Sequence, residues 1–227
     1  MESPLRSRAI AEEILDGEWL DARELRINLR EMAMLDRLPG GTSDSVRATV
    51  RLLDGVTHGT VLDVGTGSGV FVRRLLRRRN VQVIASDLRP EVLAVTADNL
   101  TGIDGVTLLQ ADVRSLPLED AAVDVAHASL LLHHLDPSDA VTALREMRRV
   151  ARSGVVVNDL RRGRLAFVAT ATTVLALSRG RYTRHDGVLS ARRAYTLPEL
   201  DELATAAGLH VAWRTRRHWP RVTTIFR

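Results

Sequence analysis

Two rhythms of apolar and polar positions divide the chain. In the first part, apolar side chains recur at helical spacing, as at Leu25, Leu29, Met32 and Leu35, and predict helices over 5–15, 21–37 and 43–53. From Thr60 onward, short apolar runs predict strands at 60–64, 81–86, 106–110, 123–128 and 154–158. The segments between them predict helices at 69–79, 90–100 and 137–150, and a terminal pair of strands is expected at 209–217 and 222–226.

This alternation predicts the fold class. Strands that alternate with helices need crossover connections, which make the strands parallel and cover both faces of the sheet. We therefore expect an α/β fold with a mostly parallel, seven-stranded sheet and helices on both faces. Residues 1–55 form the predicted N-terminal helical cap, and residues 56–227 form the core.

A glycine-rich turn follows the first predicted strand, in the stretch TVLDVGTGSGVFVRRLL at 60–76. Gly65, Gly67 and Gly69 let the backbone turn tightly and bring its N–H groups to a ligand at a helix N-terminus. The dinucleotide fingerprint fits poorly, because Val70 stands where its last glycine should be. A phosphate-binding P-loop needs a lysine, and the chain has none.

Two acidic residues narrow the choice of ligand. The carboxylate of Asp63, two residues before Gly65, would repel a pyrophosphate but could pair with a cationic ligand. Asp87 ends the second predicted strand, where an acid can accept hydrogen bonds from both hydroxyls of a ribose. A ligand with a ribose and a positive charge suits this turn.

Composition excludes several classes of protein. With 227 residues, 45% hydrophobic and 26% charged, the chain is long enough for one globular domain. It has no cysteine, no signal-peptide pattern and no apolar run of membrane-spanning length, so we expect a cytoplasmic protein without a membrane span. The net charge is +4 and the 32 basic residues are all arginine, but interspersed acids disfavour a nucleic-acid partner.

Four ordered blocks carry a family resemblance. They are VLDVGTGSG at 61–69, VIASDLRPEVLAVTADNL at 83–100, LLQADVRSLPLEDAAVDVAHASLLLHHL at 108–135 and LREMRRVARSGVVVNDL at 144–160. The sequence resembles the class I methyltransferases. This resemblance implies a Rossmann-like class I methyltransferase fold, S-adenosyl-L-methionine as cofactor and S-adenosyl-L-homocysteine as product.

The resemblance also implies the cofactor contacts. Asp87 would hold the ribose hydroxyls, Leu88 would lie against the adenine, and Asp112 would accept from the adenine amino group. The full implied set is Asp63, Gly65, Thr66, Gly67, Gly69, Asp87, Leu88, Asp112, Val113, Ser129 and Leu130. Asp112 could instead cap the turn before the segment RSLP.

Methyl transfer to a hydroxyl benefits from a general base, and histidine is suited to this role. The candidates are His133 and His134, shortly after Ser129, and His185 in the polar segment GRYTRHDGVLSARRAYT. Each could instead cap or pack locally. The other residues expected at the acceptor site are Asn158, Asp159, Tyr182 and Tyr195. An insertion at about 160–196 would cover that site, although its polar part could also be a surface loop.

The fourth strand ends in HASL, without the acid that an oxygen-rich Mg²⁺ site would need, and we therefore predict no metal. The apolar run at 165–178 is too short to span a bilayer. As a helix it would wall an apolar acceptor pocket, pack into the core or form a homodimer contact.

The acceptor is inferred by resemblance. The Pro-Pro-aromatic motif of base N-methyltransferases is missing after the fourth strand, where SLLLHHL stands. The chain is similar to small bacterial ubiquinone-biosynthesis-type and type III polyketide synthase-associated methyltransferases, which implies O-methylation of a phenolic or polyketide-derived molecule. Two alternatives stay open. One is an RNA-modifying enzyme or RNA-binding module using Arg73, Arg74, Arg77 and Arg78; the other is a noncatalytic cofactor-binding protein.

Overall fold

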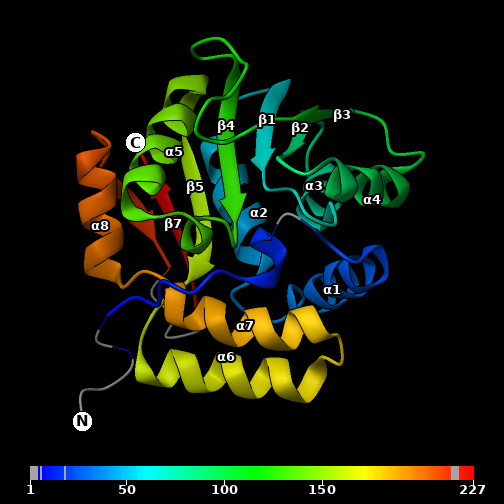
Figure 1. Ribbon diagram of the computed structural model, residues 1–227. Helices are drawn as coiled ribbons and strands as arrows, with labels where there is room; N and C mark the ends of the chain where they lie inside the picture. Colours follow the sequence, from blue (N-terminus) through cyan, green and yellow to red (C-terminus); the bar gives the residue numbers. More distant parts are fainter. Residues whose placement is uncertain (1–4, 6, 18, 216–219) are drawn as a thin grey trace.

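The computed structural model describes residue 5 and residues 7–17, 19–215 and 220–227. Within them, one seven-stranded sheet has the order β3-β2-β1-β4-β5-β7-β6 (Figure 1). The strands are β1 (Gly59–Val64), β2 (Val81–Asp87), β3 (Val106–Gln110), β4 (Val123–Ser129), β5 (Ala151–Leu160), β6 (Val211–Arg214) and β7 (Arg221–Phe226). The first five pair in parallel, and β7 pairs antiparallel with both β5 and β6. The predicted α/β fold class is confirmed.

The helices lie in three groups. They are α1 (Ala22–Leu35), α2 (Thr42–Leu52), α3 (Val70–Leu76), α4 (Pro90–Leu100), α5 (Pro137–Val150), α6 (Arg164–Leu177), α7 (Arg181–Arg193) and α8 (Leu197–Ala206). Two short 3-10 helices are η1 (Ile14–Asp16) and η2 (Leu132–His134). Helices α5 and α8 share one hydrophobic core on one face of the sheet, and α2 and α3 share a second.

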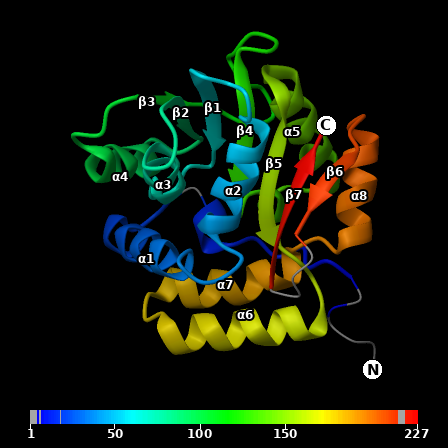
Figure 2. The ribbon, with the colours of Figure 1, turned by 180° about the vertical axis from the view of Figure 1, so that it is seen from behind.

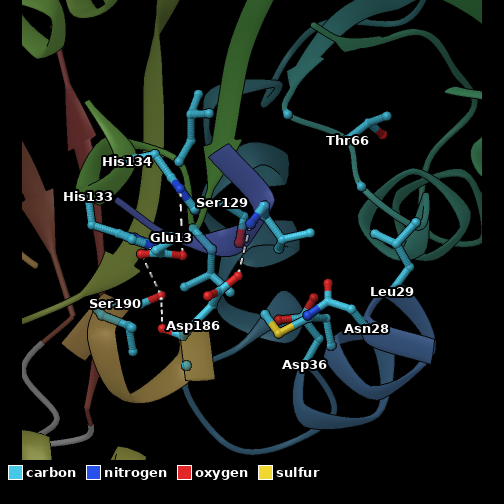
Figure 3. Close-up of a pocket in the computed structure, with 18 of the residues that line it drawn as sticks. Glu13, Asn28, Leu29, Asp36, Thr66, Ser129, His133, His134, Asp186 and Ser190 are labelled. Carbon is cyan, nitrogen blue, oxygen red and sulfur yellow. Dashed lines mark hydrogen bonds and ion pairs between the residues drawn. The ribbon is translucent and has the colours of Figure 1, made fainter. Parts of the chain in front are cut away.

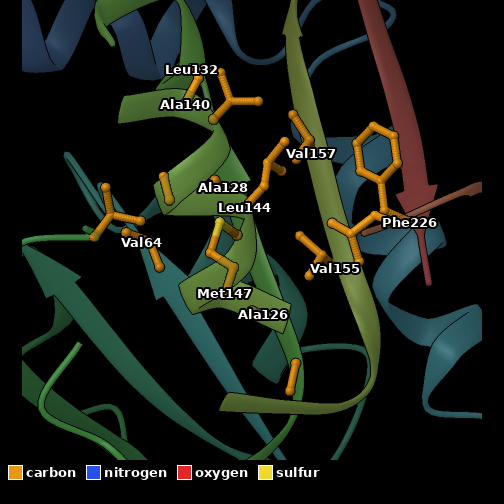
Figure 4. Close-up of a cluster of buried hydrophobic side chains, with 14 of the residues drawn as sticks. Val64, Ala126, Ala128, Leu132, Ala140, Leu144, Met147, Val155, Val157 and Phe226 are labelled. Atoms are coloured by element: carbon orange, nitrogen blue, oxygen red, sulfur yellow. The ribbon is translucent and has the colours of Figure 1, made fainter. Parts of the chain in front are cut away.

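Strand residues supply both cores because their side chains alternate between the two faces. On β1, Leu62 and Val64 face α5, whereas Val61 faces α2 and α3. On the α5 face, Leu144 and Met147 pack against β4 and β5, with Phe226 beside them (Figure 4). Burial on both faces explains why these strands read as continuous apolar runs in the sequence.

The third group lies beyond the carboxyl ends of the parallel strands. There α7 packs against α6, α1, η1 and η2, and α6 forms the outermost layer (Figures 1 and 2). Helix α1 begins where the Asp21 carboxylate accepts hydrogen bonds from the N–H groups of Arg23 and Glu24. By contrast α2, assigned to the cap in the sequence analysis, packs on β4, β5 and β7.

Two local predictions were wrong. The described part of 5–15 is not a helix, and only the short η1 turn forms at its end. Its N–H groups have acceptors elsewhere: Ile14 and Leu15 donate to the Asp186 carboxylate, at 2.9 and 3.1 Å. The alternative of a surface loop over 180–196 also fails, because α7 occupies most of that segment. Residues 216 and 217 of the predicted strand at 209–217 lie outside the described residues.

Candidate functional site

A cavity of about 1040 Å³ lies at the carboxyl edge of the sheet. The β1–α3 loop and the residues after β2 and β4 line one side of it, and α1, α6, α7 and the η1 segment line the other. Figure 3 shows Thr66 of the glycine loop on one side and Glu13, His133 and His134 gathered on the opposite side. Residues from both ends of the chain therefore enclose one space.

The glycine loop has the backbone that the sequence predicted. Gly65 and Gly69 have φ angles of 65° and 73°, in the left-handed region that side chains rarely adopt. A Cβ at Gly69 would also lie 3.1 Å from the side chain of Leu100. The N–H of Thr66 donates to the Ser86 carbonyl at 2.9 Å, which ties the loop to β2. Gly65, Thr66 and Gly67 all line the cavity.

Asp63 lies beneath this loop as a buried carboxylate. One oxygen accepts a hydrogen bond from the Thr66 hydroxyl at 2.7 Å, and the other lies 2.7 Å from Nδ1 of His127. His127 stands beside Asp63 in the β1–β4 register and stacks on Phe71. No arginine among the described residues pairs with Asp63, so its negative charge is available to a cationic ligand.

Asp87 lies at the end of β2 and faces the same cavity. Its carboxylate accepts hydrogen bonds from the N–H groups of Arg89, at 3.1 Å, and Gly67, at 3.4 Å. Burial raises the pKa of Asp87 above its ordinary value, which the nearby N–H groups partly oppose. The next residue, Leu88, is exposed and lines the cavity, where a flat ring could lie against it.

Of the remaining predicted cofactor residues, Asp112, Val113, Ser129 and Leu130 line the cavity, whereas Gly69 does not. Asp112 accepts hydrogen bonds from the backbone and guanidinium of Arg114, and this pairing lowers its pKa. This side chain therefore does cap its local turn. The hydroxyl of Ser129 accepts from Arg221 at 2.7 Å, Leu130 has a positive φ of 54°, and Val113 is buried.

The histidine side of the cavity contains a buried acid–imidazole pair. Nδ1 of His133 lies 2.6 Å from Asp159 Oδ1, so the Nδ1–H donates to this carboxylate. The other nitrogen, Nε2, then carries the lone pair, and it lies 4.0 Å from Glu13 Oε1. Although burial favours the neutral acid, the interactions with His133 hold the pKa of Asp159 below its ordinary value.

Glu13 and Asp16 have contrasting environments beside His134. Burial raises the pKa of Glu13 to about 7, against opposition from His134 and from the hydroxyl of Ser190, which donates to it at 2.9 Å. Asp16 is less buried and lies 2.8 Å from His134 Nδ1, and the interactions with His134 and Arg193 lower its pKa to about 2 despite burial. The site thus holds a protonatable acid next to an ionised one.

Two arginines fix the turn that carries the histidines. Arg193 donates to the carbonyls of His133 and His134, at 3.1 and 2.6 Å, and to Asp16. Arg8 donates to the carbonyls of His133 and Leu135, at 2.6 and 2.7 Å. Carbonyls near a strand end that face no neighbouring strand are satisfied in this way.

Five predicted acceptor or catalytic residues are not among the described residues that line the cavity. Asn158 is buried and donates to the carbonyl of Gly40 and the hydroxyl of Thr223. Asp159 is hydrogen-bonded to His133, and half-exposed His185 pairs with Asp186. The Tyr182 hydroxyl accepts from the N–H of Asp21, and the Tyr195 hydroxyl donates to the Leu135 carbonyl. Burial raises the pKa of Tyr195 to about 12.

Sequence reasoning missed several polar residues of the cavity: Glu13, Asp16, Asn28, Asp186, Ser190 and Arg193. They belong to η1 and its flank, α1 and α7, outside the four motif blocks. One signal was present, because the N-terminal segment AEEILDGE carries acids beside apolar residues. Nothing in that segment identifies Asp186 as its partner.

Within the described residues, one group of side chains brings three possible metal-ligand atoms within 4.8 Å of one another. It consists of Glu13, His133 and His134. Both imidazoles already share Nδ1 with a carboxylate, and Glu13 accepts from Ser190. None of the described helices is long and apolar enough to cross a bilayer.

Comparison with known proteins agrees with this geometry. Residues 61–154 match the family described as "Methyltransferase domain". A malonyl-[acyl-carrier protein] O-methyltransferase of Serratia marcescens is 37% identical over 97 residues, which are 43% of this chain and 36% of that protein. An uncharacterized 37.1 kDa protein in transposon TN4556 of Streptomyces fradiae is 30% identical over 194 residues, 80% of this chain and 52% of that protein.

The fold has matching solved structures as well. A SAM-dependent methyltransferase from Aquifex aeolicus superposes with a TM-score of 0.64 at 20% identity, covering 92% of this chain and 98% of that one. The chain spans only about a third to a half of the two curated relatives described above. The ordered motifs, the glycine loop, the sheet topology and the matched domain agree: this chain carries a class I S-adenosylmethionine-dependent methyltransferase domain.

Proposed function

We propose that this chain methylates a hydroxyl group of a small, largely apolar molecule, without a metal. One observation carries the proposal: the glycine loop, Asp87 and His133 line one cavity, and the Asp159 carboxylate lies 2.6 Å from Nδ1 of His133. The residues between them are mostly apolar, among them Leu25, Leu29, Met32 and Val174. This lining favours a phenolic or polyketide-derived acceptor, in keeping with the family resemblance.

The protein residues fit the cofactor. Gly65 and Gly67 have no side chains, which leaves room for the cofactor along the loop. Asp87 offers a carboxylate to the ribose hydroxyls. Asp63 adds a buried negative charge near a cationic ligand. When bound, S-adenosylmethionine supplies a methyl group already activated by its sulfonium.

We assign removal of the proton from the acceptor hydroxyl to His133. Its Nε2 would accept the proton of the acceptor hydroxyl, which would prepare that oxygen to receive the methyl group that bound S-adenosylmethionine would supply. Asp159 holds the imidazole in the required tautomer through the Nδ1–H hydrogen bond and stabilises the imidazolium that results. Orientation of the acceptor by the cavity wall supplies a further part of the rate.

The RNA alternative loses support. Arg73 donates to the carbonyl of Asn99, and Arg74 donates to the hydroxyl of Ser43, so both contact neighbouring helices. Neither is among the residues that line the cavity, although Arg73, Arg77 and Arg78 line a separate groove beside α3. A largely apolar cavity suits a small molecule better than a nucleic acid, which needs an open basic groove.

Cofactor binding is the first test. Isothermal titration with S-adenosylhomocysteine should show binding by the wild type and at least about 10-fold weaker binding by Asp87→Ala, since a hydrogen bond to a charged group contributes about 1.5–3 kcal/mol. Asp98→Ala, which removes an exposed acid of α4 paired with Arg26, should bind like the wild type. Absence of binding by a folded wild type would refute the proposal.

Methyl transfer to phenolic acceptors is the second test. His133→Asn should lower kcat by about 100-fold or more, because a positioned base contributes about 10²–10⁴. Binding of S-adenosylhomocysteine should be unchanged in this variant, and His185→Asn should keep full activity. Cofactor binding without transfer to any acceptor would favour the noncatalytic alternative.

A further inference from the structure

The outward face of α6 is unusually apolar for an exposed helix. On this face the side chains of Leu165, Val168 and Leu175 are 86%, 59% and 46% exposed. The sequence has no charged residue from 165 to 178. Figures 1 and 2 show α6 as the outermost element, with α7 between it and the rest of the fold. Contiguous exposed apolar surface of this kind marks an interaction site.

Arginines stand at both ends of this helix. Arg164 begins it, and Arg179, Arg181 and Arg184 follow its end; all four are exposed. The acids nearest the second end already accept hydrogen bonds from the backbone: Glu31 from the N–H groups of Arg179 and Gly180, and Glu24 from that of Arg181. An apolar face bounded by cations is the pattern of a helix that lies on an anionic membrane surface.

The opposite face of α6 belongs to the cavity. Ala169, Thr170, Thr173 and Val174 line it, and the side chain of Val174 lies 3.0 Å from the position that a Cβ on Gly187 of α7 would take. Helix α6 therefore forms part of the wall of the proposed acceptor site and exposes its other face. A molecule dissolved in a lipid phase beside α6 would lie next to that wall.

We propose that α6 docks this protein on the surface of an anionic lipid bilayer, with Leu165, Val168 and Leu175 inserted among the acyl chains and the flanking arginines at the headgroups. Resting on the proposed function, we infer also that the acceptor is drawn from that bilayer. A second copy of this chain fits the face less well. Two copies joined through α6 would bring the arginine-bearing ends of both helices together, and like charges repel.

Vesicle sedimentation tests the docking without any acceptor. The wild type should sediment with phosphatidylcholine vesicles that contain phosphatidylglycerol and stay in solution with phosphatidylcholine alone. Leu165→Glu combined with Val168→Glu should weaken the association by at least about 10-fold, since it places two charges in the apolar layer. Leu108→Glu, at an exposed site on the far edge strand β3, should bind like the wild type.

The arginines have their own test. Arg164→Gln combined with Arg179→Gln should weaken binding by about 10-fold or more, at about 1 kcal/mol for each cation, and added salt should weaken the wild type more than this variant. Circular dichroism and S-adenosylhomocysteine titration would show that each variant is folded.

Three results would overturn the docking. They are no sedimentation with anionic vesicles, equal binding to both kinds of vesicle, and a wild-type dimer that the Leu165→Glu, Val168→Glu variant breaks. Vesicle binding and methyl transfer are independent measurements. Docking without transfer would refute the proposed function alone, and transfer without docking would refute this inference alone.

Discussion

Sequence reasoning missed Glu13, and the fold changes the acidity of its side chain. Burial raises its pKa from 4.5 to about 7, so the folded chain keeps a proton that the unfolded chain releases. Below about pH 4.5 Glu13 is protonated in both the folded and the unfolded chain and does not change the free energy of unfolding. Between pH 4.5 and 7 it lowers the free energy of unfolding progressively, and above pH 7 the loss reaches up to about 3 kcal/mol.

Glu13→Gln should remove this pH-dependent loss, because an amide of the same shape has no proton to release. Urea unfolding at pH 5 and pH 8 should show the variant gaining stability over the wild type as the pH rises. Glu12→Gln changes the exposed neighbour and should show no such gain. Parallel pH profiles of wild type and Glu13→Gln would contradict the assignment.

At the residue scale, the positions of the proposed cofactor residues could be predicted from the sequence. The positions of the proposed acid–base residues could be predicted only in part. Gly65 and Asp87 lie within motif blocks whose spacing is fixed by a strand and the turn after it. His133 was identified, but its neighbour Glu13 is 120 positions away and Asp159 had been assigned to the acceptor itself. Long-range pairings leave no local pattern in a single sequence.

The N-terminal segment and α7 depend on each other as elements. Asp186 accepts the N–H groups of Ile14 and Leu15, and Ser190 donates to Glu13 one helical turn further along. This explains why the expected helix over 5–15 did not form, since tertiary acceptors replace the helical ones. It also explains the burial of Asp186 within a segment whose composition reads as polar.

Asp186→Ala should release this segment. Two partly buried N–H groups would lose a charged acceptor, at a cost of about 2–3 kcal/mol. Hydrogen exchange should become faster at Ile14 and Leu15 while the amides of the β1–β4 pair keep their protection. Glu202→Ala, on the exposed side of α8, provides the matched control. Unchanged exchange at both amides would show that the segment is held by other contacts.

At the scale of the whole molecule, the parallel sheet was predictable because strands that are buried on both faces have continuous apolar sequences. A cover from 160–196 was expected, but the contacts of α7 with α1 and η1 were not, because these elements meet only in three dimensions. Since the cavity exists only in the folded chain, a ligand that fills it must stabilise the fold.

S-Adenosylhomocysteine at about 100 times its Kd should therefore add about 2.7 kcal/mol to the free energy of unfolding. For a domain of this size that corresponds to a rise in Tm of roughly 5–10 °C. Asp87→Ala should show a much smaller rise at the same concentration, because it removes the acceptor for the ribose. The amides of residues 13–16 should also gain protection from exchange, since a filled cavity holds η1 in place. A rise in Tm without that protection would mean that the cofactor half of the cavity is occupied independently of the histidine half.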